Sequence, residues 1–259
     1  MAAGDGFVPD WRDAAAYEPL IEADRSLFAW EWLRRDRNYR AAAERALEAG
    51  GIPGRGDPAE TPERWGLHAF EPPGRMVPEA RPVWSVGVHP YVLVVEAGPP
   101  EGGDVLDLER FARLSTLIAW ANGREHLLIS DGYRAIRLDV VSGSLADGPV
   151  ELRYRLSGLA TAERPLLTLR RLLALWRTGR LSRSLHPEEA RARRLLLMLR
   201  AQDALGAGAN QRTIAAELLG GGATRERWRV EASSVRSQVQ RLVRGARRMA
   251  EGGFRQLLR

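Results

Sequence analysis

The hydrophobic pattern changes near Pro165, and this change restricts the folds open to the chain. Between Trp65 and Gly158, short apolar runs alternate with Pro and Gly residues, a pattern typical of β-strands joined by turns. Beyond Pro165, apolar residues recur at the spacing of amphipathic helices. The sequence therefore predicts an α+β fold, in which a small antiparallel β-sheet precedes an all-α C-terminal part.

The first fifty residues predict a small helical unit. The segment that follows, GGIPGRGDPAETPE, places four glycines and three prolines in fourteen residues, which neither a helix nor a strand tolerates. Small domains need large buried groups, so we expect a core built from the aromatic residues Trp11, Tyr17, Phe28, Trp30 and Trp32. We predict a helical domain over 1–50, a linker over 51–64, a sheet region over 65–160 and a helical domain over 161–259.

Several stretches of the middle region predict strands, beginning with VWSVGV at 83–88 and YVLVVEA at 91–97. Asp131-Gly132 separates HLLIS from YRAIRLDVV and suits the tight turn of a hairpin. In ELRYRLSG, alternation points Leu152, Tyr154 and Leu156 inward. Residues 107–121 combine helical spacing with a strand-like run, so the pattern leaves their structure open.

Four helices are predicted in the C-terminal part, of which the first ends near Gly179. The second has Pro187 at its first position. Asn210 caps the third, QRTIAAELLG, and the fourth begins near residues 233–234. The inward stripe of the second helix consists of Leu195, Met198, Leu199 and Leu205.

The composition excludes several classes of enzyme. All 39 basic residues are arginines, so the chain lacks the lysine that phosphate-loop hydrolases, pyridoxal enzymes and protein kinases require. The absence of cysteine excludes thiol nucleophiles, thiolate zinc sites, iron–sulfur clusters and disulfides. His68, His89, His126 and His186 show no metal-ligand spacing. Adjacent Glu125 and His126 would point to opposite faces of a strand. We therefore expect no catalytic site, no metal site and no cofactor.

No part of the sequence indicates a membrane protein. The N-terminal residues lack the basic and apolar regions of a signal peptide, and no stretch approaches the roughly eighteen apolar residues of a membrane span. We therefore expect a cytoplasmic protein.

The charges are unevenly distributed along the chain. Residues 1–150 carry a net charge of −8, whereas residues 151–259 carry +14, and together they give the overall +6. Segregation of this kind is typical of proteins that bind nucleic acid or another polyanion. The C-terminal part is the candidate region for such binding.

The last predicted helix has two distinct faces. Val235, Val239, Leu242, Ala246 and Met249 recur at alternating intervals of four and three residues and form an inner face. The outer face carries Ser237, Gln240, Arg241, Arg244, Arg247 and Arg248, with Arg236 on its flank. Such a face suits a DNA major groove, where guanidinium groups pair with guanine edges or phosphates. The alternative is an ordinary solvated amphipathic helix.

The third and fourth helices follow each other in the order of a helix-turn-helix. Between them, GGATRERWRVEA inserts about a dozen residues in place of the short turn, and Trp228 is a candidate anchor for this insert. Exposed arginines of the preceding helix would extend contact to the DNA backbone; they are Arg191, Arg193, Arg194 and Arg200. The candidate DNA contacts are Gln211, Arg212, Thr213, Arg236, Ser237, Gln240, Arg241, Arg244, Arg247 and Arg248.

Residues 165–259, from PLLTLRRLLALWRTGRL through QRTIAAELLG to the last helix, resemble the DNA-binding domain of RovC-type type VI secretion transcription factors. The same domain occurs in FseA-type activators of conjugative-element excision in proteobacteria. PDWRDAAAYEPL and FAWEWLRRDRNYR resemble a small transcriptional-regulator-like domain that often precedes it. The resemblance implies a helix-turn-helix variant and transcriptional regulation. Some relatives act as anti-activators that bind another regulator instead of DNA.

The sequence thus predicts a nucleoid-associated bacterial regulator, an activator that binds DNA sequence-specifically and reads the major groove with the helix near 234–249. We expect double-stranded DNA and a second copy of the chain as partners, together with RNA polymerase or another regulator. Two alternatives remain open. One is an interaction module or anti-activator that docks another regulator, and the other is RNA binding through the same basic surface.

Overall fold

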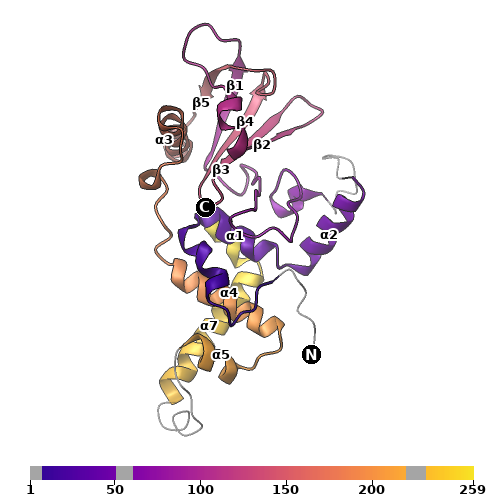
Figure 1. The fold of residues 1–259 in the computed structure, drawn as a ribbon, viewed down its shortest axis with the longest axis vertical. Coiled ribbons are helices and arrows are strands. Elements are labelled where there is room, and N and C mark those ends of the chain that lie inside the picture. The colour runs from indigo at the N-terminus through magenta and orange to yellow at the C-terminus, as the bar shows by residue number, and fades with distance from the viewer. Residues whose placement is uncertain (1–7, 51–60, 220–231) are drawn as a thin grey trace.

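The computed structural model describes residues 8–50, 61–219 and 232–259. Along the chain, helices precede and follow a five-stranded sheet. The molecule is elongated, with the sheet at one end and α5 at the other (Figure 1). The predicted fold class is confirmed, since N-terminal helices, a mostly antiparallel sheet and C-terminal helices follow in that order. The predicted insert with Trp228 lies outside the described residues.

The N-terminal elements are η1 (Ala15–Glu22), α1 (Arg25–Leu33), α2 (Arg37–Glu48) and η3 (Pro62–Trp65). Carboxylates start both α-helices, because Asp24 accepts hydrogen bonds from the backbone N–H groups of residues 26 and 27, and Asp36 from those of residues 38 and 39. The predicted aromatic core is confirmed, since Trp11, Tyr17, Phe28, Trp30 and Trp32 are each at most 3 % exposed.

The strands are β1 (Val92–Gly98), β2 (Ser115–Ala119), β3 (Glu125–Ser130), β4 (Ala135–Ser142) and β5 (Glu151–Arg155), in the spatial order β2-β3-β4-β1-β5. The hairpin between β3 and β4 is confirmed. Its turn is held by Asp131 Oδ1, which accepts hydrogen bonds from the N–H groups of Tyr133 and Arg134 at 2.9 and 2.8 Å. The neighbours β1 and β4 are parallel, and the other pairs are antiparallel. Residues 107–121 contain both η4 (Leu108–Leu114) and β2.

Two strand predictions were wrong, wholly or in part. In the stretch 83–88, only Trp84 makes a bridge, to Leu67, and a turn over 85–89 follows because the N–H groups of Val88 and His89 bond to Ser85 O. In β5, Leu152 packs against the core, but Tyr154 and Leu156 are 42 % and 41 % exposed, because β5 ends the sheet and its last residues lie beyond the packed core.

The C-terminal helices are α3 (Glu163–Thr178), η5 (Arg183–Leu185), α4 (Ala192–Gly206), α5 (Gln211–Leu218), α7 (Ala232–Ala250) and η6 (Gly253–Leu258). Gly179 ends α3 with a positive φ of 72°, and Asn210 caps α5, both as predicted. The prediction that Pro187 opens the second helix was wrong. The residues after Pro187 form a turn instead. In this turn Glu189 accepts hydrogen bonds from the N–H groups of Arg191 and Ala192, and α4 begins only at Ala192.

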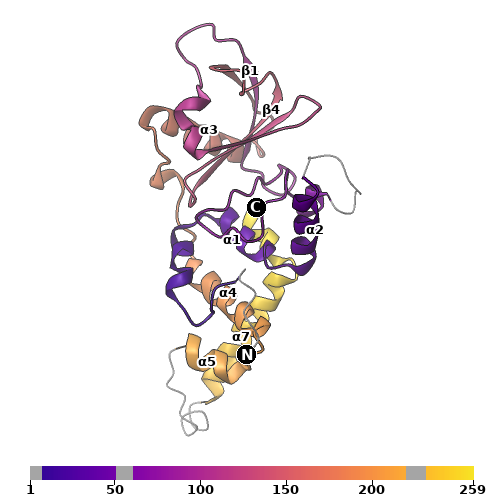
Figure 2. The ribbon, with the colours of Figure 1, turned by 45° about the vertical axis from the view of Figure 1, so that its right-hand side comes forward.

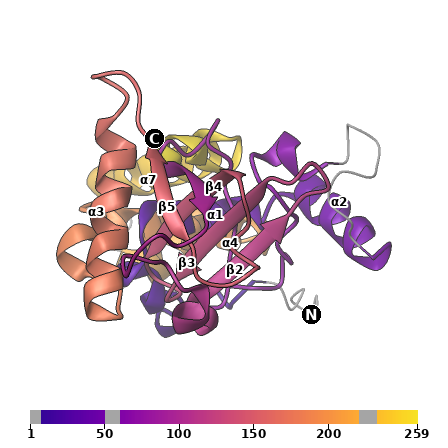
Figure 3. The same cartoon turned by 90° about the horizontal axis from the view of Figure 1, so that it is seen from above.

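Two separate hydrophobic cores divide the molecule. We call the first the helical body, and its core combines residues 11–84 with α4, α5, α7 and η6. The second, the sheet body, joins the strands and η4 to α3 through Leu172 and Leu175. In the view from above, α3 runs along the β5 side of the sheet (Figure 3). Packing therefore groups α3 with the sheet and groups the other C-terminal helices with the N-terminal ones.

Candidate nucleic-acid interface

Helix α7 presents one buried and one exposed face, as its sequence predicts. Val239, Leu242, Ala246 and Met249 are buried, and Val235 is half-buried. The same buried face includes Val243, which the sequence reasoning did not assign although its spacing to Val239 and Ala246 fits a helix. The predicted outer residues are all exposed; they are Arg236, Ser237, Gln240, Arg241, Arg244, Arg247 and Arg248.

A glycine in the middle of α7 lets this helix lie close to α4. A Cβ atom on Gly245 would lie 2.5 Å from Cε and 3.2 Å from Sδ of Met198, closer than side chains pack. The close approach buries the inner face of α7 against α4 over its central turns. It fixes the direction in which the opposite, arginine-rich face points.

The start of α5 is fixed beside α7. Asn210 Oδ1 accepts hydrogen bonds from the N–H and the hydroxyl of Thr213, at 3.0 and 3.2 Å. The inner side of α5 is buried in the helical body through Ile214, Ala215 and Leu218. The exposed first turn of α5 therefore lies next to the outer face of α7, at the end of the molecule farthest from the sheet (Figures 1 and 2).

A surface hollow of about 380 Å³ lies between these two helices. The residues around it are Gln211, Gln240, Val243, Arg244, Arg247, Arg248 and Glu251. Of the predicted contacts, Gln211, Gln240, Arg244, Arg247 and Arg248 thus come together. Extending the helical wheel of α7 by two residues would have placed Glu251 on the same side as Arg244 and Arg247.

The remaining predicted contacts lie around the hollow or are engaged elsewhere. Arg212 is exposed on the first turn of α5, and Arg236, Ser237 and Arg241 are exposed on α7. Thr213, by contrast, is only partly exposed, and its hydroxyl donates a hydrogen bond to the cap residue Asn210.

Within the described part of the chain, the guanidinium groups of Arg241, Arg244, Arg247 and Arg248 make no hydrogen bond or ion pair. A buried arginine of α4 behaves differently. Arg200 was predicted to extend the contact surface, and this prediction was wrong. Its side chain is buried and donates hydrogen bonds to the carbonyl oxygens of Trp11 and Arg12 at 2.8 and 3.1 Å. Arg193 and Arg194 are exposed on α4.

The fold brings together two histidines that the sequence shows as unrelated. The rings of His68 and His126 stack with centroids 3.5 Å apart, and His126 Nδ1 donates a hydrogen bond of 2.7 Å to Asp139. Burial, aided by neighbouring His126 and Arg137, lowers the pKa of His68 to about 4. Parallel stacked rings direct their nitrogen lone pairs along separate planes, and the Asp139 oxygen already bonds Arg137 at 2.9 Å. His68, His126 and Asp139 nevertheless offer ligand atoms within 4.8 Å of one another, and Nε2 of each histidine has no hydrogen-bond partner in the described residues. The expected absence of a metal site therefore stays a prediction.

Glu125, the neighbour of His126, is bound elsewhere. Its carboxylate accepts hydrogen bonds from the Ser144 hydroxyl and from Leu145 N–H, each at 2.7 Å. As predicted for neighbours on a strand, Glu125 and His126 point to different partners; that they do not act as an acid–base pair stays a prediction.

Two family models match separate parts of the chain. Residues 157–259 match the type VI secretion system transcription factor DNA-binding domain of the RovC type. Residues 10–68 match the proteobacterial transcriptional regulator-like domain. The chain carries a transcription-factor DNA-binding domain. No curated protein and no solved structure matches the chain.

The RovC-type domain extends from the start of α3 to the end of the chain and so includes the whole α5–α7 surface. It meets the regulator-like domain in a buried ion network. The Arg35 guanidinium pairs with both carboxylate oxygens of Asp203, at 2.7 and 2.9 Å, and also bonds Glu31. Burial by itself would lower the pKa of Arg35, but these carboxylates raise it above its ordinary value. The network therefore holds Arg35 in its charged form.

No helix in the described residues combines the length and the apolar character that crossing a membrane requires.

Proposed function

We propose that this protein is a nucleoid-associated transcriptional activator that binds DNA sequence-specifically and reads the major groove with the outer face of α7. The observation that carries the proposal is the row formed by Arg244, Arg247 and Arg248. These arginines are exposed, have no partner in the described residues, and lie beside amide side chains and the first turn of α5. Guanidinium groups and amides are the side chains that pair with guanine and adenine edges. The matched DNA-binding domain contains this entire surface.

In the proposed complex, α5 and α7 act as the two helices of a helix-turn-helix variant. The first turn of α5, with Gln211 and Arg212, contacts phosphates, and α7 lies in the groove. Two copies of the chain would place their α7 helices in half-sites about one helical turn apart. RNA polymerase or another regulator would contact the acidic half of the chain.

The test compares two pairs of exposed arginines. The first pair, Arg244→Ala with Arg248→Ala, removes two charges from the outer face of α7. The matched control, Arg170→Ala with Arg180→Ala, removes two charges from the same half of the chain in or just after α3. The ligand is a duplex that the wild-type protein selects from a random library. Binding is measured by gel retardation and fluorescence anisotropy over a range of salt concentrations.

We expect the α7 pair to weaken binding at least about thirty-fold, since each arginine that reads a base contributes about 1–3 kcal/mol. The slope of the logarithm of the binding constant against the logarithm of the salt concentration should become shallower, by up to about two released counterions. The α3 control should bind within about two-fold of the wild type. Equal losses in both pairs would contradict a specific α7 interface. A protein that selects no duplex but co-purifies with another regulator would be an anti-activator, and preference for structured RNA would indicate RNA binding.

A further inference from the structure

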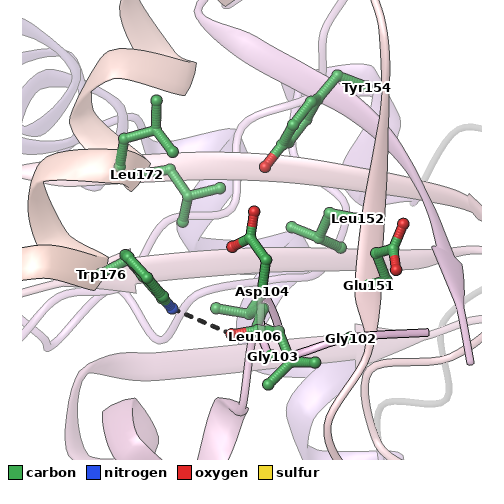
Figure 4. Close-up of a pocket in the computed structure, with 11 residues that line it drawn as sticks. Gly102, Gly103, Asp104, Leu106, Glu151, Leu152, Tyr154, Leu172 and Trp176 are labelled. Carbon is green, nitrogen blue, oxygen red and sulfur yellow. Dashed lines mark hydrogen bonds between the residues drawn. The ribbon is translucent and has the colours of Figure 1, made fainter. Parts of the chain in front are cut away.

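A pocket of about 270 Å³ lies in the sheet body, between the edge strand β5, helix α3 and the loop over 102–106. Figure 4 shows the Asp104 side chain near its middle, with Trp176 and Leu172 of α3 on one side and Leu152 and Tyr154 of β5 on the other. The pocket is far from the α5–α7 surface, which occupies the opposite end of the molecule (Figure 1). The pocket shares no lining residue with the hollow between α5 and α7.

The pocket combines apolar walls with negative charge. Its lining residues include the carboxylates of Asp104 and Glu151 and no basic side chain. Within the described residues, Asp104 makes no side-chain hydrogen bond or ion pair, and Glu151 accepts only a long hydrogen bond of 3.3 Å from Glu101 N–H. Their charge is therefore available to a ligand.

The walls are held in place by the protein itself. Trp176 Nε1 donates a hydrogen bond of 3.0 Å to Val105 O, which ties the loop to α3. Burial and the nearby Asp104 carboxylate raise the pKa of Tyr154, so its hydroxyl stays protonated at neutral pH. Tyr154 and Leu173 remain 42 % and 39 % exposed, so apolar surface reaches solvent here. An apolar surface of this kind is one that a ligand can cover.

We propose that this pocket binds a small organic cation, an ammonium or guanidinium group carried on an apolar body. The carboxylates would pair with the cationic group, and the faces of Tyr154 and Trp176 attract a cation electrostatically. The leucine side chains would cover the apolar body. An anion of the same shape would be repelled by both carboxylates. The bound cation would join α3, the first helix of the matched DNA-binding domain, to the sheet and the loop.

The test uses three probes of one shape on the full chain: 2-phenylethylammonium, neutral 2-phenylethanol and anionic phenylacetate. Binding is measured by isothermal titration calorimetry and by the shift in melting temperature. Asp104→Asn removes the central charge while keeping the shape. Asp147→Asn is the matched control, because Asp147 is an exposed aspartate without a partner in the described residues and lies outside the pocket.

We expect saturable binding of the ammonium probe alone, weakened at least about five-fold by Asp104→Asn and less than two-fold by Asp147→Asn. Glu151→Gln should also weaken binding of the ammonium probe, because it removes the second carboxylate of the pocket. The proposal is overturned if the ammonium probe does not saturate up to about 10 mM, if all three probes bind alike, or if Asp104→Asn binds as the wild type does. The α7 variants described above should leave this binding unchanged, so the two proposals can fail separately.

Discussion

The helical body and the sheet body are held together in different ways. The sheet body draws its core from one continuous part of the chain, between Leu93 and Leu181, and neighbouring strands supply its hydrogen bonds. The helical body joins the two ends of the chain, and its central ion pair links Arg35 to Asp203 over 168 positions. The helices that carry the α5–α7 surface are therefore packed on the N-terminal helices, although separate family models match the two segments.

Among substitutions in the helical body, Arg35→Ala should destabilise the protein most. The substitution leaves the buried carboxylates of Glu31 and Asp203 without their shared guanidinium, so it should lower the free energy of unfolding by about 3–5 kcal/mol. Urea unfolding followed by circular dichroism measures the loss. Arg193→Ala is the control, because this arginine of α4 is exposed and has no side-chain partner in the described residues. A loss as small as that of the control would show that the two ends do not depend on this pair.

A smaller effect is expected from Gly245→Val, which places a branched side chain against Met198 in the contact between α4 and α7. Overpacking of this kind costs about 1–3 kcal/mol of unfolding free energy. Met198→Ala creates space, so the double variant should recover part of the loss in a double-mutant cycle. Additive losses in the double variant would argue against the close helix contact.

The smallest effect concerns the joint between the two bodies, where His68 from the helical side stacks on His126 of β3. Because burial lowers the pKa of His68 from 6.5 to about 4, the unfolded chain binds more protons between these values. The contribution of neutral His68 to the free energy of unfolding should be fully present above pH 6.5 and should be lost as the pH drops toward 4. His68→Phe keeps a ring in the stack but cannot titrate, so its melting temperature should fall less over this range. An equal fall in both proteins would exclude His68 as the cause.

Local patterns in the sequence predicted those features that depend on neighbours along the chain. The two faces of α7, the Asn210 cap and the turn at Asp131 follow from helical spacing, capping and turn preferences. These features define most of the candidate DNA-binding surface.

Features that depend on distant segments were missed. Arg200 looked like a surface arginine, but the carbonyl groups of Trp11 and Arg12 lie against it and satisfy its guanidinium. His68 and His126 meet only because the chain before the sheet packs on one face of β3 and β4. No local spacing encodes such contacts, so they require the fold.

The two faces of α7 differ in how freely their residues can be exchanged. The inner face is fixed by Gly245 and by the buried side chains around it, so most substitutions there reduce stability. Within the described residues, the guanidinium groups of Arg244, Arg247 and Arg248 make no hydrogen bond or ion pair, so exchanging them should leave the packing unchanged. If the outer face of α7 binds DNA as proposed, single substitutions there would change the binding preference while the fold stays stable.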